Sequence, residues 1–224
     1  MTTLILATRN KHKIAEITAI LGPRYRFLTL QDFPEAPMVR EDQTTFSGNA
    51  MKKAKELARW MQGMPSVEFR VPGPNALVVA DDSGLEVDAL KGAPGIHSAR
   101  FAALDAKPGQ PPPTSVDAAN NEKLLRLLSN VPTGQRHARF RCALATIRVK
   151  PPQAAMAGQN FEAVCDGHVQ FAAAGHGGFG YDPLFVPLGH TASFGQLPAA
   201  TKNQLSHRAQ ALQKLKRYLD TLGL

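Results

Sequence analysis

The sequence predicts an α/β fold, in which a mixed, largely central twisted sheet is flanked by helices and the domain has two lobes. Apolar runs of strand length alternate with segments of helical periodicity along the chain, and this alternation favours such a sheet. The chain has 224 residues, of which 43% are hydrophobic, enough to bury a sizeable core. Because no internal repeat or clear linker interrupts the pattern, a single domain is expected over residues 1–224.

The first part of the chain is expected to form a strand followed by two helices. Residues Thr2 to Thr8 form a short apolar run, typical of a buried strand. Lys11 to Leu21 place apolar residues on one helical face, and Phe46 to Gln62 do the same over a longer segment. A polar junction between a strand and a helix is a common place to bind an anion.

The middle of the chain contains a β-branched run that ends in carboxylates. Ala76 to Ala80 predicts a buried strand, and residues 81–84 (Asp-Asp-Ser-Gly) predict a tight turn into a second strand over residues 85–89. Because neighbouring side chains of a strand point to opposite faces, Asp81 and Asp82 are expected to serve different tasks.

The second half of the chain is expected to contain two more strands and two more helices. The predicted elements are a helix over Asp117 to Leu128, paired strands over Arg139 to Val149 and Phe161 to Phe171, a glycine-rich turn over Gly175 to Gly180, and a last helix from Ser206 to about Leu219.

Composition excludes several classes of protein. No apolar run approaches the roughly 20 residues of a membrane-spanning helix, so no membrane partner is expected. Cys142 and Cys165 fit neither a disulfide framework nor a cysteine-rich zinc site, and we expect two reduced thiols in a cytoplasmic protein. The 26 Lys and Arg residues against 18 Asp and Glu residues give a net charge of +8, which is compatible with nucleic acid, an acidic membrane surface or a small polyanion such as a nucleotide.

The placement of the charges along the chain favours some of these partners over others. Asp81, Asp82, Glu86 and Asp88 fall within eight residues, and basic residues gather in other loops and helices. An acidic cluster among basic loops favours a metal ion that holds a phosphate ester over a nucleic-acid stripe. Other basic residues, on the last helix, are expected to form a solvated face: Lys214, Lys216 and Arg217.

Four polar clusters are candidate sites, and each has a plain structural alternative. Residues 8–13 could bind phosphates or be an ordinary helix start, and Asp81 and Asp82 could hold Mg²⁺ or be turn residues. Residues 177–183 could stack a base on Phe179 and Tyr181, or these rings could fill the core. Residues 202–208 could donate hydrogen bonds to a ligand or be a capped basic helix.

Five segments, taken in order, favour the functional alternatives. ATRNKHK, TTFSGNAMKKA, ADDSGLEVDALKGAPGIHSARF, GGFGYDPLF and SHRAQAL together resemble the inosine triphosphate pyrophosphatase family over nearly the whole chain. The resemblance implies a Mg²⁺-dependent hydrolase that converts dITP, ITP or XTP to the monophosphate and pyrophosphate, which removes these nucleotides from the pool. It also implies a nucleotide cleft between two lobes, a homodimer and no stable nucleic-acid partner.

The resemblance also implies a role for particular residues. Asp82 would be the catalytic carboxylate and would hold Mg²⁺ together with Glu41. The residues expected to bind the substrate are Thr8, Arg9, Asn10, Lys11, His12 and Lys13 at the triphosphate, Ser83 beside the catalytic acid, Phe179, Gly180, Tyr181 and Asp182 around the base and sugar, and Lys202, His207 and Arg208 at the 6-oxo edge of the purine.

The chain departs from the family pattern in a few places. Arg9 stands where the family usually has glycine, and Gly48 stands where a glutamate commonly precedes Asn49, which removes one carboxylate near the metal. Pro/Gly-rich segments near 62–75, 106–114 and 150–160 are interpreted as loop insertions.

Two other functions remain as alternatives. A non-catalytic basic protein that binds nucleic acid or nucleotides would also explain the net charge of +8. A pyrophosphatase of modified pyrimidine triphosphates would use similar chemistry on a similar fold. Turnover of a panel of nucleoside triphosphates separates all three.

Overall fold

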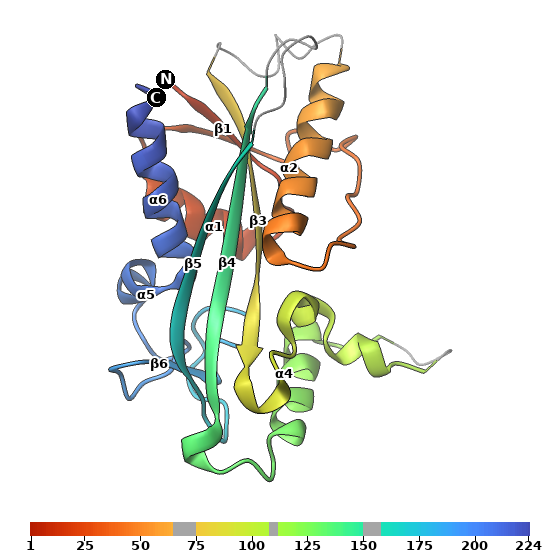
Figure 1. Cartoon of the computed structure of the whole chain (residues 1–224), viewed down its shortest axis with the longest axis vertical. Coiled ribbons are helices and arrows are strands. Elements are labelled where there is room, and N and C mark those ends of the chain that lie inside the picture. The colour runs from red at the N-terminus through yellow and green to blue at the C-terminus, as the bar shows by residue number, and fades with distance from the viewer. Residues whose placement is uncertain (65–74, 108–111, 150–157) are drawn as a thin grey trace. The chain divides into compact units, whose positions relative to one another are not determined.

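The computed structural model of the chain describes residues 1–64, 75–107, 112–149 and 158–224 (Figure 1). Parts of the three segments interpreted as loop insertions, near 62–75, 106–114 and 150–160, lie outside these ranges, namely residues 65–74, 108–111 and 150–157. No helix among the described residues is long and apolar enough to span a bilayer.

A six-stranded mixed sheet forms the centre of the fold, in the order β2-β1-β3-β4-β5-β6. The strands are β1 (Thr3–Leu6), β2 (Arg26–Thr29), β3 (Ala76–Val87), β4 (His137–Arg148), β5 (Gly158–Val169) and β6 (Phe185–Pro187). β1 pairs in parallel with both β2 and β3, whereas β5 and β6 are antiparallel. The predicted mixed sheet flanked by helices is therefore confirmed.

The helices follow the predicted order, with one addition. They are α1 (Lys11–Leu21), α2 (Phe46–Gln62), α4 (Val116–Leu127), α5 (Ala199–Leu205) and α6 (His207–Thr221), together with the short 3-10 turns η1 (Asp88–Leu90), η2 (Gly95–Arg100), η3 (Ala102–Asp105) and η4 (Thr133–Gln135). The bounds predicted for α1 and α2 are confirmed. The sequence patterns did not indicate β2, β6 and α5, because segments of three to seven residues are too short to display a clear period.

Side-chain caps explain where three of these helices begin. The side chain of Asn10 accepts hydrogen bonds from the backbone N–H groups of His12 and Lys13 at the start of α1. Thr45 and Ser115 cap α2 and α4 in the same way. Each cap satisfies backbone donors that a helix start otherwise leaves without a partner.

The chain divides into two compact units, each with its own apolar core. Unit 1 comprises residues 1–82, 142–163 and 208–224, and unit 2 comprises residues 83–141 and 164–207. In unit 1, aliphatic side chains of α1 and α6 pack against one face of β1, β3 and β4, and α2 lies on the opposite face (Figure 1). The core of unit 2 is more aromatic and includes Phe140, Phe185 and Phe194.

The tight turn predicted at residues 81–84 is wrong, because β3 continues without interruption from Ala76 to Val87. The carboxylates of Asp81 and Asp82 do not have to reach solvent at a turn, because cations from other elements of unit 1 contact both of them. Gly84 suits a strand here because a Cβ atom at this position would lie 2.6 Å from the carbonyl oxygen of Gly95. The prediction that the two carboxylates point to opposite faces is confirmed by their separate partners.

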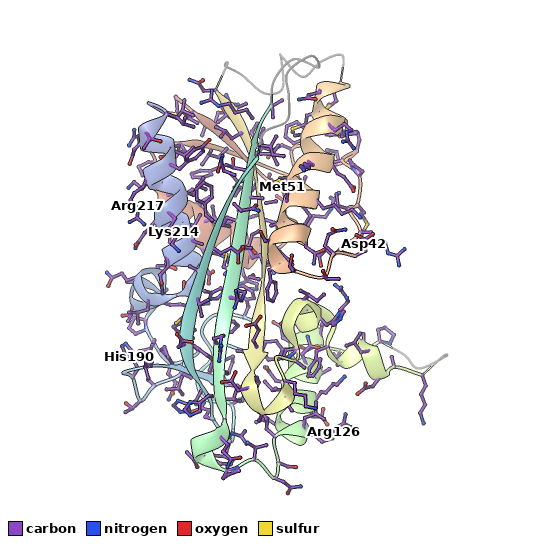
Figure 2. All side chains as sticks on the ribbon, viewed as in Figure 1. Asp42, Met51, Arg126, His190, Lys214 and Arg217 are labelled. Atoms are coloured by element: carbon purple, nitrogen blue, oxygen red, sulfur yellow. The ribbon has the colours of Figure 1, made fainter. Side chains whose placement is uncertain are left out.

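Two smaller predictions are confirmed. Cys142 in β4 and Cys165 in β5 are buried free thiols. Lys214, Lys216 and Arg217 are exposed on α6, and Figure 2 labels Lys214 and Arg217 on this helix.

Candidate active site

Asp81 lies on the face of β3 that α1 and α6 cover, and two cations surround it. Lys13 from α1 forms an ion pair with one carboxylate oxygen, and Nε of Arg208 from α6 lies 2.9 Å from the other. Burial by itself would raise the pKa of Asp81, but Arg208 and Lys13 hold the pKa well below its ordinary value. Asp81 is therefore an anchor for both cations, and its contacts with them favour the ionised carboxylate.

Arg208 is itself held by two carboxylates. Its Nη1 lies 2.5 Å from Oε2 of Glu16, in addition to the contact between Nε and Asp81. Only 1% of Arg208 is exposed, and although burial acts against its charge, Asp81 and Glu16 raise the pKa of the guanidinium above its ordinary value. Two ion pairs on one planar group fix both its position and its orientation.

Asp82 lies on the opposite face of β3 and contacts two residues of α2. Nζ of Lys53 lies 3.0 Å from Oδ1, and Nδ2 of Asn49 donates to Oδ2 at 3.2 Å. Burial raises the pKa of Asp82 above its ordinary value, although Lys53 and Lys13 act in the opposite direction. The two neighbouring carboxylates thus differ in basicity, and Asp82 is the better proton acceptor of the two.

Lys53 joins Asp82 to Glu41. Its ammonium group donates to Oε1 of Glu41 at 2.9 Å and to the backbone carbonyl of Asp81 at 2.7 Å. Burial by itself would lower the pKa of Lys53, but Asp82 and Glu41 keep the pKa above its ordinary value. The adjacent Asp42, labelled in Figure 2, pairs instead with Lys52 at 2.7 Å.

The Glu41 and Asp82 carboxylates are the groups of this cluster that could hold a cation. Both reach one ammonium group, so a single cation can lie within contact distance of both. Mg²⁺ in proteins is commonly bound by one or two carboxylates, with water and substrate phosphates completing its shell. Within the ranges that the structure describes, no group of three or more His, Cys, Asp or Glu residues could hold a metal ion.

The junction of β1 and α1, residues 8–13, contributes Lys13 of α1 to this cluster. Lys13 reaches Asp81, whereas Nη2 of Arg9 donates to the backbone carbonyl of Ala36 at 3.1 Å. Thr8 accepts a hydrogen bond from the backbone N–H of Asn10 at 3.1 Å, which shapes the loop. The remaining predicted phosphate contacts, Lys11 and His12, are exposed at the start of α1.

A second polar cluster lies in unit 2 and contains three predicted residues. Nζ of Lys202 lies 2.5 Å from Oδ2 of Asp182 and 5.0 Å from the ring centre of Phe179. Oδ2 of Asp182 also accepts a hydrogen bond from the backbone N–H of Phe179 at 2.7 Å. A side chain at Gly178, where φ is +71°, would overlap the Asp182 carboxylate. The glycine-rich turn therefore permits the close approach that places Lys202 beside an aromatic ring.

The other predicted base contacts lie in separate surroundings. The ring of His207 is buried and stacks on Phe140, with centroids 4.8 Å apart. Tyr181 is a core residue whose hydroxyl donates to the carbonyl of Ser98 at 2.9 Å, whereas Phe179 is partly exposed. Ser83 follows Asp82 in β3. Lys202 and His207 belong to unit 2, and Arg208 belongs to unit 1.

The sequence patterns did not single out three residues of these clusters: Glu16, Asn49 and Lys53. Asn49 and Lys53 are four residues apart on α2 and therefore share one face, which both use to contact Asp82. This spacing within TTFSGNAMKKA was the signal that could have identified them. No comparable signal marked Glu16, because its partner Arg208 is 192 residues away in the sequence.

Comparisons with known proteins agree over nearly the whole chain. The family model described as "Ham1 family" matches residues 4–218. A dITP/XTP pyrophosphatase of Shouchella clausii is 41% identical over 98% of both chains, and one of Geobacillus kaustophilus is 43% identical over 96% of this chain and 93% of its own.

Solved structures give the same result. The structure of a HAM1 protein from Coxiella burnetii has a TM-score of 0.76 and 30% identity, covering 99% of this chain and 100% of its own. The Staphylococcus aureus Ham1 protein has a TM-score of 0.75 and 31% identity, with the same coverage.

Proposed function

The chain belongs to the Ham1 family, and we infer that it is a nucleoside triphosphate pyrophosphatase that acts on non-canonical purine nucleotides. Relatives named dITP/XTP pyrophosphatase match it over nearly its full length. The observation that carries the assignment is the cluster of the buried Asp82 with the partly buried Lys53 and Glu41, which combines a basic carboxylate with a second carboxylate and a cation. The expected reaction converts dITP, ITP or XTP to the monophosphate and pyrophosphate, which removes them before their incorporation into DNA and RNA.

At the phosphate end of the substrate, Asp82 would accept a proton from the attacking water. The water oxygen bonds to the α-phosphorus, and the bridging oxygen leaves with pyrophosphate and its electron pair. A raised pKa favours this role, because a more basic carboxylate accepts a proton more readily. When bound by Glu41 and Asp82, Mg²⁺ would neutralise charge on the phosphates and make the bound water more acidic.

Basic residues would offset the remaining negative charge of the triphosphate. Lys13 and Lys53 lie beside the two carboxylates of β3 and can stabilise charge that develops on the leaving pyrophosphate. The polar and basic loop is proposed to contact the phosphates through the rest of its residues: Thr8, Arg9, Asn10, Lys11 and His12, with Ser83 beside the catalytic acid.

At the purine end, Lys202, His207 and Arg208 are proposed to recognise the 6-oxo group. Lys202 has only donors, so it can pair with a 6-oxo group but offers no acceptor to the amino group of adenine. Its ion pair with Asp182 fixes the ammonium next to Phe179, which is proposed to stack on the base together with backbone contacts from residues 180–182. With adenine in the site, the Lys202 ammonium would face another donor in place of an acceptor, which disfavours adenine.

The substrate panel tests this function directly. With Mg²⁺, the protein is expected to hydrolyse dITP or XTP at least about 10²-fold faster than ATP, because the 6-amino group of adenine offers the donors of the site no acceptor. We expect GTP to be a poor substrate as well. Chromatography of the products should show a monophosphate and pyrophosphate, and a chelator should stop the reaction. Release of orthophosphate with a diphosphate would contradict the reaction, and DNA or RNA binding without turnover would favour the non-catalytic alternative.

We also propose that the enzyme is a cytoplasmic homodimer. Buried free thiols at Cys142 and Cys165 suit a reducing compartment. Light scattering of the purified chain is expected to give about twice its 24.2 kDa mass across micromolar concentrations. A mass equal to one chain at every concentration would exclude the dimer.

A further inference from the structure

In unit 2, two side chains of α4 form hydrogen bonds with the backbone of one residue of the glycine-rich loop, Gly180. Oδ2 of Asp117 accepts a hydrogen bond from the backbone N–H of Gly180 at 2.7 Å, and Nδ2 of Asn121 donates to the carbonyl of Gly180 at 3.0 Å. Asp117 and Asn121 are four residues apart on α4, so both project from the same face of the helix. The pair therefore holds both polar groups of one loop residue.

Gly180 stands at the centre of the segment proposed to bind the base. It joins Phe179, whose ring is partly exposed beside Lys202, to Tyr181, whose hydroxyl is anchored at Ser98. Its φ of +63° lies in the left-handed region that favours glycine, and a Cβ atom here would meet no other atom within 4 Å. The backbone conformation thus favours glycine, and because glycine loses more conformational freedom on ordering than any other residue, contacts that hold it reduce this freedom before the nucleotide binds.

The helix itself does not depend on these two contacts. Leu124 of α4 is fully buried in the core of unit 2. Two other side chains of α4 also bind backbone groups: the side chain of Asn120 accepts from the backbone N–H of Ala102, and Lys123 donates to the carbonyl of Phe101 at 2.7 Å. Because these contacts already secure α4, the contacts from Asp117 and Asn121 act mainly on the loop.

We propose that Asp117 and Asn121 are positioning residues that fix the Phe179 ring for purine binding by clamping Gly180. The proposal rests on the proposed function, since it assigns this loop to the base. A carboxylate that accepts from a backbone N–H is a strong hydrogen bond, and the paired amide restrains the other side of the same residue. A loop held in its binding conformation avoids the entropic cost of ordering when the nucleotide binds.

Loss of the two contacts with Gly180 should change the kinetic constants in a different way from partial unfolding. Contacts with the base are remote from the reacting phosphorus and are equal in the ground state and the transition state, so their loss raises KM and leaves kcat unchanged. Partial unfolding would instead reduce the active fraction, which lowers kcat and leaves KM unchanged.

The test uses the full chain with Asp117→Ala, Asn121→Leu, their combination and the conservative Asp117→Asn. Loss of one such hydrogen bond is expected to raise the dissociation constant of dIMP and the KM of dITP about tenfold. Asp117→Asn retains an acceptor and should restore most of the affinity. In the double variant, the dissociation constant of dIMP should rise by less than the product of the two single increases, because losing either hydrogen bond already releases the same loop.

Glu122→Gln is the matched control, because it changes an exposed carboxylate on the same helix next to Asn121. Inorganic tripolyphosphate, which has no base, should bind wild type and all variants equally in calorimetry. The clamp would be refuted by an unchanged dIMP dissociation constant, by a fall in kcat alone, or by a parallel loss of tripolyphosphate affinity. Failure of the proposed function is a separate result, since it would be seen as wild-type protein that does not release pyrophosphate from dITP.

Discussion

Replacing Asp82 with asparagine is expected to lower kcat for dITP by about 10²- to 10⁴-fold, because the amide cannot accept the proton of the attacking water. Asparagine keeps the size of the side chain and can still accept a hydrogen bond from Lys53 or Asn49, which contact Asp82 in the wild type. Steady-state release of pyrophosphate measures the loss. Asp220→Asn, which changes an exposed carboxylate on α6, is the control and should retain full turnover.

The same substitution should leave the protein folded. Burial raises the pKa of Asp82 in the folded state, so its contribution to the free energy of unfolding is present below the unfolded pKa, about 3.9, and is lost as the pH rises through the folded value. The ionised carboxylate thus contributes no stability of its own at neutral pH, and Lys53 keeps Glu41 as a partner, so Asp82→Asn should stay folded and lose less stability in urea than Asp81→Asn. Unchanged turnover would remove Asp82 from its catalytic role.

Replacing Asp81 with asparagine is expected to have the larger effect on stability. The carboxylate of Asp81 neutralises Lys13 and Arg208, and the guanidinium of Arg208 is almost fully buried. Removing one partner of a buried ion pair leaves a buried charge without full compensation, so the free energy of unfolding should fall by about 3 kcal/mol. Urea denaturation monitored by circular dichroism measures this change.

The contribution of Asp81 to stability depends on pH with the opposite sign to the contribution of Asp82. The pKa of Asp81 lies well below its ordinary value in the folded state, so its contribution to stability is present above the unfolded pKa and is lost as the pH falls through the folded pKa. The difference between wild type and variant should therefore be constant near neutrality and shrink below about pH 4. Asp220→Asn breaks an exposed pair and should cost at most about 1 kcal/mol. Equal free energies of unfolding for Asp81→Asn and Asp220→Asn would contradict the anchoring role of Asp81.

Local features of the sequence were sufficient for much of the fold and for the family. The predicted bounds of α1 and α2 agree with the structure, because the apolar period selects the face that each helix buries. The period of two in a strand placed Asp81 and Asp82 on opposite faces, as the structure has them. The order of five motifs indicated the family that the full-length comparisons identify.

The chemical difference between Asp81 and Asp82 depended on contacts far apart in the sequence. Residues 13 and 208 lower the pKa of one carboxylate, while burial beside α2 raises the pKa of its neighbour. The same long-range contacts let β3 run through residues 81–84, where local turn propensity predicted a break. The clamp on Gly180 likewise joins residues about 60 positions apart. Protonation and backbone positioning follow from which charges and donors folding brings together, so neither can be inferred from local residue patterns.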